Sequence, residues 1–186
     1  MARRVRGRFF AEYVRMIRRR KDVEWARWLV AEDITYLSQH IESDDWYPME
    51  TFERLGIAIL SEFHGATLDA VRSWGRLSAG HYGVEHPDLI APNDPVESLM
   101  RLKVLRSTLF DFPAFDIPML NDSHAHVVVT YHMSSVAEEA ACHQTMGFCE
   151  EILSLSGATD VRAEFQERSW TGDARTLCSF EWQSPK

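Results

Sequence analysis

The chain of 186 residues is 45% hydrophobic and 11% aromatic, which is enough to bury one substantial core and too short to argue for two, so we expect a single domain over residues 1–186. Its net charge of -8 conceals an asymmetry, because residues 1–28 hold ten Lys/Arg against three Asp/Glu while the remainder holds ten against twenty-five. No apolar run approaches the roughly 18 residues of a membrane-spanning helix, and no apolar segment follows the basic start as in a signal peptide. These features predict a cytoplasmic protein.

Residues 8–64 show the apolar periodicity of short helices separated by polar breaks. The apolar stripes lie at residues 9–17, 25–29 and 34–41. Asp44 or Asp45 is expected to cap a further helix, which has Pro48 in its first turn and stops at Gly65.

Two more helices are predicted before the chain changes character. The first spans residues 68–81, and its internal Gly75 and Gly80 indicate a kink or a close helix contact. A loop over residues 83–95 follows, and Pro95 opens a helix that runs to Leu109.

The C-terminal part carries the patterns of four strands around one helix. The strands are predicted at residues 112–120, 124–133, 159–169 and 176–183, and the helix at residues 136–155. Asn121-Asp122 forms the first turn, and Gly157 ends the helix. The fold class is therefore α+β, with a mainly helical N-terminal half (1–110) followed by a ββαββ half (111–186) whose sheet is antiparallel.

The last hairpin has a predicted register. If Gly172-Asp173 is a two-residue turn, then Glu167 lies opposite Cys178 on the apolar face of the sheet. The other predicted pairs on this face are Ala163 with Trp182 and Phe165 with Phe180.

A carboxylate on an apolar face must be paired, protonated or bound to metal. Glu167 and Cys178 are therefore candidate zinc ligands. Alternatively, Glu167 reaches solvent or pairs with Arg168 or Arg175, while Cys178 is a small core residue. We favour this second interpretation.

Two further clusters suggest binding sites. His124, His126 and His132 share one face of a predicted strand and can chelate a transition metal, but a solvated strand face explains them better. The basic run from Arg18 to Lys21 is a candidate site for nucleic acid or anionic lipid. It lacks interleaved aromatic residues, so a solvated helix end is the better explanation.

The sequence offers no catalytic constellation. No His stands beside a Ser with an acidic residue to orient it, no Gly-rich loop follows a strand, and no carboxylate pair stands out. Cys142, Cys149 and Cys178 are an odd and sparse set that fits reduced core thiols rather than disulfides. No catalytic residue is predicted, and we expect a protein that is not an enzyme.

The segments SLMRLKVLRSTLFDFPAFDI and HVVVTYHMSS…MGFCEEILSLSGA, in a chain of helices followed by ββαββ, resemble the heme nitric oxide/oxygen-binding (H-NOX)-like superfamily. The C-terminal part, from MGFCEEILS to LCSFEW, is similar to the 4-vinyl reductase (V4R) type of small-molecule-binding domain. The whole chain looks most like an uncharacterised family of about this length in myxobacteria. The resemblance implies a sensor fold.

The resemblance also implies which cofactors are absent. Heme-binding members carry a proximal His in the helix before the first strand, where this chain has Arg106 or a neighbour and no His. They hold the heme propionates with a Tyr-x-Ser-x-Arg motif, in which Tyr131 matches while Met133 and Ser135 replace the Ser and the Arg. A chain without heme is expected.

V4R-type sensors have a structural zinc site built from a Glu, a Cys three residues on and a Cys eight further. Glu167 and Cys178 match this pattern, Trp170 replaces the middle Cys, and Cys142 is a further candidate at a different spacing. Two matching ligands do not complete a tetrahedral site. The resemblance therefore implies that zinc has been lost, and no cofactor is predicted.

Three functional hypotheses follow. The leading one is a non-enzymatic, heme-free sensor or adaptor domain that binds a small apolar molecule in a pocket between helices and sheet. The second is an interaction module that binds a signalling protein or forms a homo-oligomer through the basic first helix or a Trp-rich patch at Trp25, Trp28 and Trp46. The third is a metalloprotein that uses His124, His126 and a carboxylate. The residues expected to line the apolar pocket, which equally suit a packed core, are Phe110, Phe112, Phe115, Val127, Val129, Tyr131, Met146 and Phe165.

Overall fold

The computed structural model describes residues 2–63 and 67–185, and the chain divides into two compact units. Unit 1 consists of Met1–Ala66 and Ser107–Phe112, and unit 2 of Thr67–Arg106 and Pro113–Lys186. The two predicted halves meet at residue 110, whereas residues 67–106 group with the sheet. That the chain behaves as one domain stays a prediction.

Unit 1 is mainly helical, as predicted, and also contains a two-stranded antiparallel sheet. Its elements are β1 (Arg4–Arg6), α1 (Gly7–Arg19), the 3-10 helix η1 (Trp25–Arg27), α2 (Ala31–Ser38), β2 (Trp46–Pro48) and α3 (Met49–Glu62). The predicted cap at Asp44 or Asp45 is wrong, because β2 pairs with β1 and α3 begins only after Pro48, which is extended. The predicted stop at Gly65 lies outside the described residues.

The basic run at the end of α1 makes contacts within unit 1. The guanidinium of Arg18 donates hydrogen bonds to the carbonyl oxygens of Tyr36 (3.0 Å) and Leu37 (2.8 Å) at the end of α2, where helix carbonyls lack partners within the helix. Arg20 forms an ion pair with Asp22, with 2.8 Å between Nη2 and Oδ2. These contacts support the helix-end interpretation of the run.

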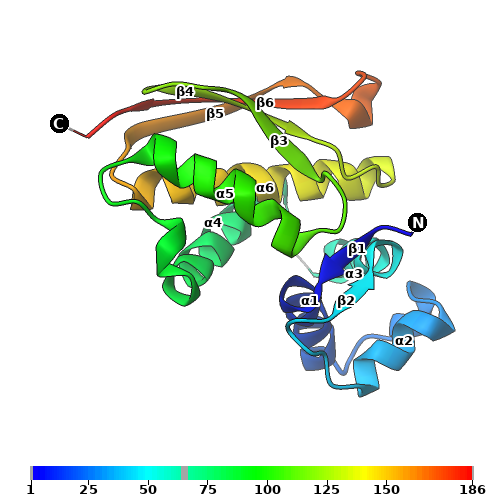
Figure 1. Cartoon of the computed structure of the whole chain (residues 1–186). Coiled ribbons are helices and arrows are strands. Elements are labelled where there is room, and N and C mark those ends of the chain that lie inside the picture. The colour runs from blue at the N-terminus through cyan, green and yellow to red at the C-terminus, as the bar shows by residue number, and fades with distance from the viewer. Residues whose placement is uncertain (1, 64–66, 186) are drawn as a thin grey trace. The chain divides into compact units, whose positions relative to one another are not determined.

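Unit 2 contains a four-stranded antiparallel sheet with the strand order β3-β4-β6-β5. Its elements are α4 (Leu68–Glu85), the 3-10 helix η2 (Pro87–Leu89), α5 (Pro95–Leu109, whose last residues belong to unit 1), β3 (Phe115–Leu120), β4 (His124–Val129), α6 (Ser135–Leu155), β5 (Thr159–Glu167), the 3-10 helix η3 (Ser169–Thr171) and β6 (Thr176–Gln183). Figure 1 shows α6 running along one face of the sheet. The predicted α+β class and ββαββ order are confirmed. In the part of the chain that the structure describes, no helix is long and apolar enough to cross a membrane.

The strand predicted over residues 124–133 ends earlier, at Val129. The amide of Thr130 still donates to the carbonyl oxygen of Ala114 (2.8 Å). His132 then adopts a left-handed backbone conformation with φ of 55°, which is uncommon for a residue with a side chain. Helix α6 begins soon afterwards, at Ser135.

The predicted register of the last hairpin is wrong. Phe165 lies opposite Cys178 rather than Phe180, a slip of two residues. Glu167 lies opposite Leu177 rather than Cys178, a slip of one, because the register shifts between Phe165 and Glu167. Since side chains alternate between the faces with a period of two, the slip of two leaves Phe165 on its predicted face. The apolar pattern therefore could not detect it.

The turn itself explains the error in register. The 3-10 helix η3 follows β5, and Gly172 then adopts φ of 108°. The carboxylate of Asp173 accepts a hydrogen bond from the backbone N–H of Arg168 (2.6 Å). The connection is therefore longer than the predicted two-residue turn at Gly172-Asp173.

Helices α4 and α6 touch backbone to backbone at two glycines. A Cβ built on Gly75 would lie 2.0 Å from the carbonyl oxygen of Gln144, and one built on Gly147 would lie 1.9 Å from that of Arg72. Side chains larger than hydrogen cannot fit at either point. The close contact predicted for Gly75 is confirmed, whereas a Cβ on Gly80 would meet nothing within 4 Å.

An ion-pair cluster fixes the same helix pair to the sheet. The Glu150 carboxylate of α6, 6% exposed, accepts hydrogen bonds from Nε of Arg72 (3.0 Å) and Nε of Arg76 (2.9 Å), both on α4. Nη2 of Arg72 also donates to the carbonyl oxygen of Ala163 in β5 (3.3 Å). Because each partner of a buried charge is needed to offset its desolvation, this cluster holds α4, α6 and β5 together.

The two glycines of α4 provide a matched test of this packing. Gly75→Ala should lower the free energy of unfolding by about 3 kcal/mol, the upper range for overpacking a core, because the new methyl group meets the backbone of α6. Gly80→Ala should raise it by about 0.5–1 kcal/mol, because alanine favours helix and the site is open. Denaturant unfolding measures both, and equal effects of the two substitutions would contradict the packing.

Candidate functional site

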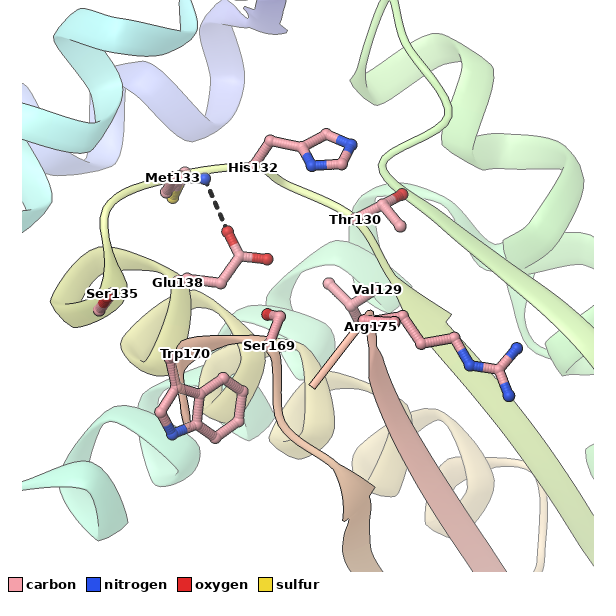
Figure 2. A pocket seen from close by; sticks show the side chains of 10 residues that line it. Val129, Thr130, His132, Met133, Ser135, Glu138, Ser169, Trp170 and Arg175 are labelled. Atoms are coloured by element: carbon pink, nitrogen blue, oxygen red, sulfur yellow. Dashed lines mark hydrogen bonds between the residues drawn. The ribbon is translucent and has the colours of Figure 1, made fainter. Parts of the chain in front are cut away.

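Unit 2 contains a cavity of about 180 Å³ where β4 leaves the sheet, α6 begins and the η3 turn approaches. Figure 2 shows the side chains around it. The lining residues are Val129, Thr130, His132, Met133, Ser135, Glu138, Ser169, Trp170, Ala174 and Arg175. Hydroxyl groups, a carboxylate and a guanidinium outnumber aliphatic groups, so the cavity is polar.

The connection from β4 to α6 forms one wall of the cavity. Oγ1 of Thr130 donates a hydrogen bond to the carbonyl oxygen of Pro113 (2.6 Å), which fixes the first residue after the strand. The left-handed turn at His132 then redirects the chain to Ser134, the N-cap residue of α6. The wall is thus set by backbone geometry rather than by apolar packing.

Glu138 is the most buried charged group of this wall, with 5% of its surface exposed. Its Oε2 accepts a hydrogen bond from the backbone N–H of Met133 (2.7 Å). The residue lies in the first turn of α6, where the helix dipole stabilises a negative charge. Its negative charge also contributes to the raised pKa of the neighbouring Tyr131 phenol, after the larger effect of burial. A negative charge is therefore built into the cavity wall.

The opposite wall comes from the hairpin turn. Ser169 and Thr176 are hydrogen-bonded through their hydroxyl groups (2.8 Å), and the Trp170 ring stands edge-on to Phe165, with 5.0 Å between ring centroids. The guanidinium of Arg175 forms a bidentate ion pair with Glu167 (Nη2 to Oε1 2.9 Å, Nε to Oε2 3.0 Å). The positive charge of this wall is therefore already offset.

The predicted pocket residues lie in both units. Phe110 and Phe112 belong to unit 1, where their rings stand 5.6 Å apart. Of the six in unit 2, Phe165 is half-buried and the following are at most 6% exposed: Phe115, Val127, Val129, Tyr131 and Met146. Val129 lines the polar cavity. Tyr131 is hydrogen-bonded to Thr145 (2.8 Å), which places its hydroxyl in the core of unit 2.

The candidate metal ligands do not come together. Glu167 pairs with Arg175 near the turn, and Cys178 lies opposite Phe165 in the core. His124 lies at the exposed surface, where its Nε2 is 3.7 Å from the Glu181 carboxylate. Within residues 2–63 and 67–185, no three His, Cys, Asp or Glu side chains are grouped as a metal site requires.

The three thiols are buried in unit 2. Burial raises the pKa of Cys149 to about 12, and it raises those of Cys142 and Cys178 as well. Since the thiolate is the reactive and metal-binding form, these residues are inert core thiols at neutral pH. This agrees with their predicted role.

Sequence reasoning missed Glu138, Ser169 and Arg175 as parts of one site. The pattern that could have revealed Glu138 is an acidic residue on the buried face of the first turn of a helix. Ser169 and Arg175 join the site only through the conformation of the hairpin turn, which could not be predicted from the sequence.

No family model matches the sequence, and no curated protein shows detectable sequence similarity to it. Solved structures do share its fold. They include a mutant of the Fe(II) unliganded H-NOX protein from K. algicida, with a TM-score of 0.64, 13% identity and coverage of 96% of this chain and 97% of that one. The H-NOX protein from S. oneidensis in the Fe(II)NO ligation state gives a TM-score of 0.62 at 12% identity, covering 96% and 99%.

A mutant of the T. tengcongensis H-NOX protein gives a TM-score of 0.59 at 14% identity, covering 97% of this chain and 98% of that one. Because these similarities extend over nearly the full length, the chain has an H-NOX-like fold. At such identities the similarity describes the fold alone.

The burial of the thiols can be tested by chemical labelling. A thiol reagent such as 5,5′-dithiobis(2-nitrobenzoate) should leave the native protein almost unmodified at neutral pH, because burial keeps the thiols protonated. The denatured chain is the control, in which all three cysteines should react. Rapid labelling of the native protein would contradict the described packing.

Proposed function

We propose that this chain is a non-enzymatic, heme-free sensor or adaptor domain that binds a small molecule in the cavity of unit 2. The observation that carries the proposal is a buried carboxylate, Glu138, in the wall of a cavity within an H-NOX-like fold. The sequence pattern indicated a small apolar ligand. Because the lining of the cavity is mostly polar, we propose a small polar ligand instead. Because a shared fold does not by itself imply a shared function, the proposal depends on the residues of the cavity.

The residues at the positions that the family resemblance assigns to heme do not fit that group. Helix α5 contains no His, and the Nη1 of Arg106 is committed to the carbonyl oxygen of Phe115 (2.7 Å). Met133 and Ser135 stand in the place of polar propionate contacts, and the Met133 amide is bonded to Glu138. These features support a heme-free domain.

The state of the candidate nucleophiles supports the proposal that the domain is not an enzyme. The three thiols are buried and protonated, and the Ser169 hydroxyl is engaged with Thr176. We also propose that the last hairpin is related to V4R-type domains. The whole chain would then belong to the myxobacterial family that it resembles. In that proposal the hairpin has no zinc, because Glu167 pairs with Arg175.

One observation favours the second candidate, an interaction module. Trp28, Val30 and Ile34 of unit 1 are large apolar residues with 38%, 48% and 37% of their surface exposed. Trp25 and Trp46 do not extend this surface freely, because Trp25 donates to the carbonyl oxygen of Arg20 (3.0 Å) and Trp46 is covered by an arginine. The exposed apolar surface around Trp28 that an interaction module would use is therefore small, which makes this the second candidate.

Native mass spectrometry and visible absorption of the protein purified without added ligand test the proposal. We expect no Soret band, before or after hemin is added, and a small molecule of low mass released on denaturation. An H-NOX protein that holds Fe(II) is the control for hemin uptake. A stoichiometric Soret band would contradict the heme-free assignment, and a bare chain in a stable oligomer would favour the interaction module.

A further inference from the structure

We propose that His143 of α6 is a pH-sensitive anchor for the last hairpin turn: the neutral ring holds Trp170 in the cavity wall, and the protonated ring releases it. This inference adds regulation by pH to the proposed function. The release of the turn can be measured on the chain without ligand. Only its effect on a ligand rests on the proposed function.

Three rings join α6 to the hairpin. The His143 ring stands edge-on to Phe165, with 4.9 Å between ring centroids, and 6.3 Å from Trp170. The rings of Phe165 and Trp170 stand 5.0 Å apart, also edge-on. Phe165 lies near the end of β5, and Trp170 lies in η3, which contacts α6. Because Trp170 also lines the cavity, this cluster fixes the aromatic part of the cavity wall.

The nitrogen of His143 that faces the interior favours the neutral ring. Its Nδ1 is buried and has no hydrogen-bond partner among the residues that the structure describes. A neutral imidazole carries a proton on one nitrogen only, whereas an imidazolium carries one on each. A protonated His143 would therefore bury a positive charge and a donor without an acceptor, both of which are costly. Protonation thus favours a ring that has left its packed position.

Charged groups of both signs face His143 from the surrounding elements. Glu139 of α6 and Asp69 of α4 favour the protonated ring, whereas Arg72 of α4 and Arg168, which follows β5, disfavour it. Burial has the largest effect and lowers the pKa of His143 from its ordinary value. Since carboxylates ordinarily stay ionised above roughly pH 5, the charge that changes in this group just below neutral pH is that of the histidine.

The direction of the pH effect follows from the lowered pKa. A released ring has the ordinary pKa, so on acidification it takes up a proton before the packed ring does. Between the lowered and the ordinary pKa, each pH unit of acidification raises the ratio of released to packed turns by about tenfold. At higher pH the ring is neutral in both forms, and the turn stays packed.

The test follows the rings by NMR in the full chain without ligand. Nuclear Overhauser contacts between Trp170 and Phe165 should weaken as the pH falls from about 7.5 to 5.5, and His143 should titrate at a lower pH than the exposed His81 of α4. Contacts that persist over this interval, or equal pKa values for the two histidines, would overturn the proposal. Neither result would decide whether the cavity binds a ligand, which native mass spectrometry tests.

Two variants assign the effect to His143. His143→Phe keeps a ring against Phe165 that cannot be protonated, and His143→Gln replaces the ring with a smaller neutral group. In both, the ratio of released to packed turns should change by less than about twofold per pH unit, instead of about tenfold. His81→Gln is the matched control and should keep the full pH dependence. An undiminished pH dependence in both His143 variants would overturn the proposal, because another group would then be the sensor.

Discussion

The backbone contact between α4 and α6 is the constraint on which unit 2 depends. Gly75 and Gly147 bring the two helices so close that no side chain fits between them, and Glu150 then binds two arginines of α4. Because Arg72 also bonds to β5, the same contact fixes α6 to the sheet. This arrangement positions α6 relative to α4 and the sheet.

The two buried acids of α6 lie in different surroundings. Glu150 is enclosed by Arg72 and Arg76 and thus belongs to the scaffold. Glu138, in the first turn of the same helix, is held by a backbone amide and lines a cavity. A buried carboxylate at the edge of a cavity gives that cavity a fixed polar group, which is the basis of the proposed site.

The sequence predicted the elements of the sheet and its α+β class because strand alternation and turn residues are local signals. It failed where a long-range pairing or a backbone conformation decides the outcome. The pairing of β2 with β1 displaced the predicted cap at Asp44 or Asp45. The register of the last hairpin slips by two residues at Phe165 and by one at Glu167, next to the η3 turn. The candidate site was missed for the same reason, because its walls come from the left-handed His132 and from that turn. Five of the six predicted pocket residues in unit 2 are buried, and their role in lining an apolar pocket stays a prediction.

Chemical-shift mapping tests the central claim, that the polar cavity of unit 2 is a ligand site. Spectra of the isotope-labelled full chain are compared as purified without added ligand and after unfolding, dialysis and refolding, which remove a bound small molecule. We predict that the amide of Met133, which is bonded to Glu138, and the indole N–H of Trp170 shift together between the two samples. Identical spectra, or shifts confined to other parts of the chain, would contradict the claim.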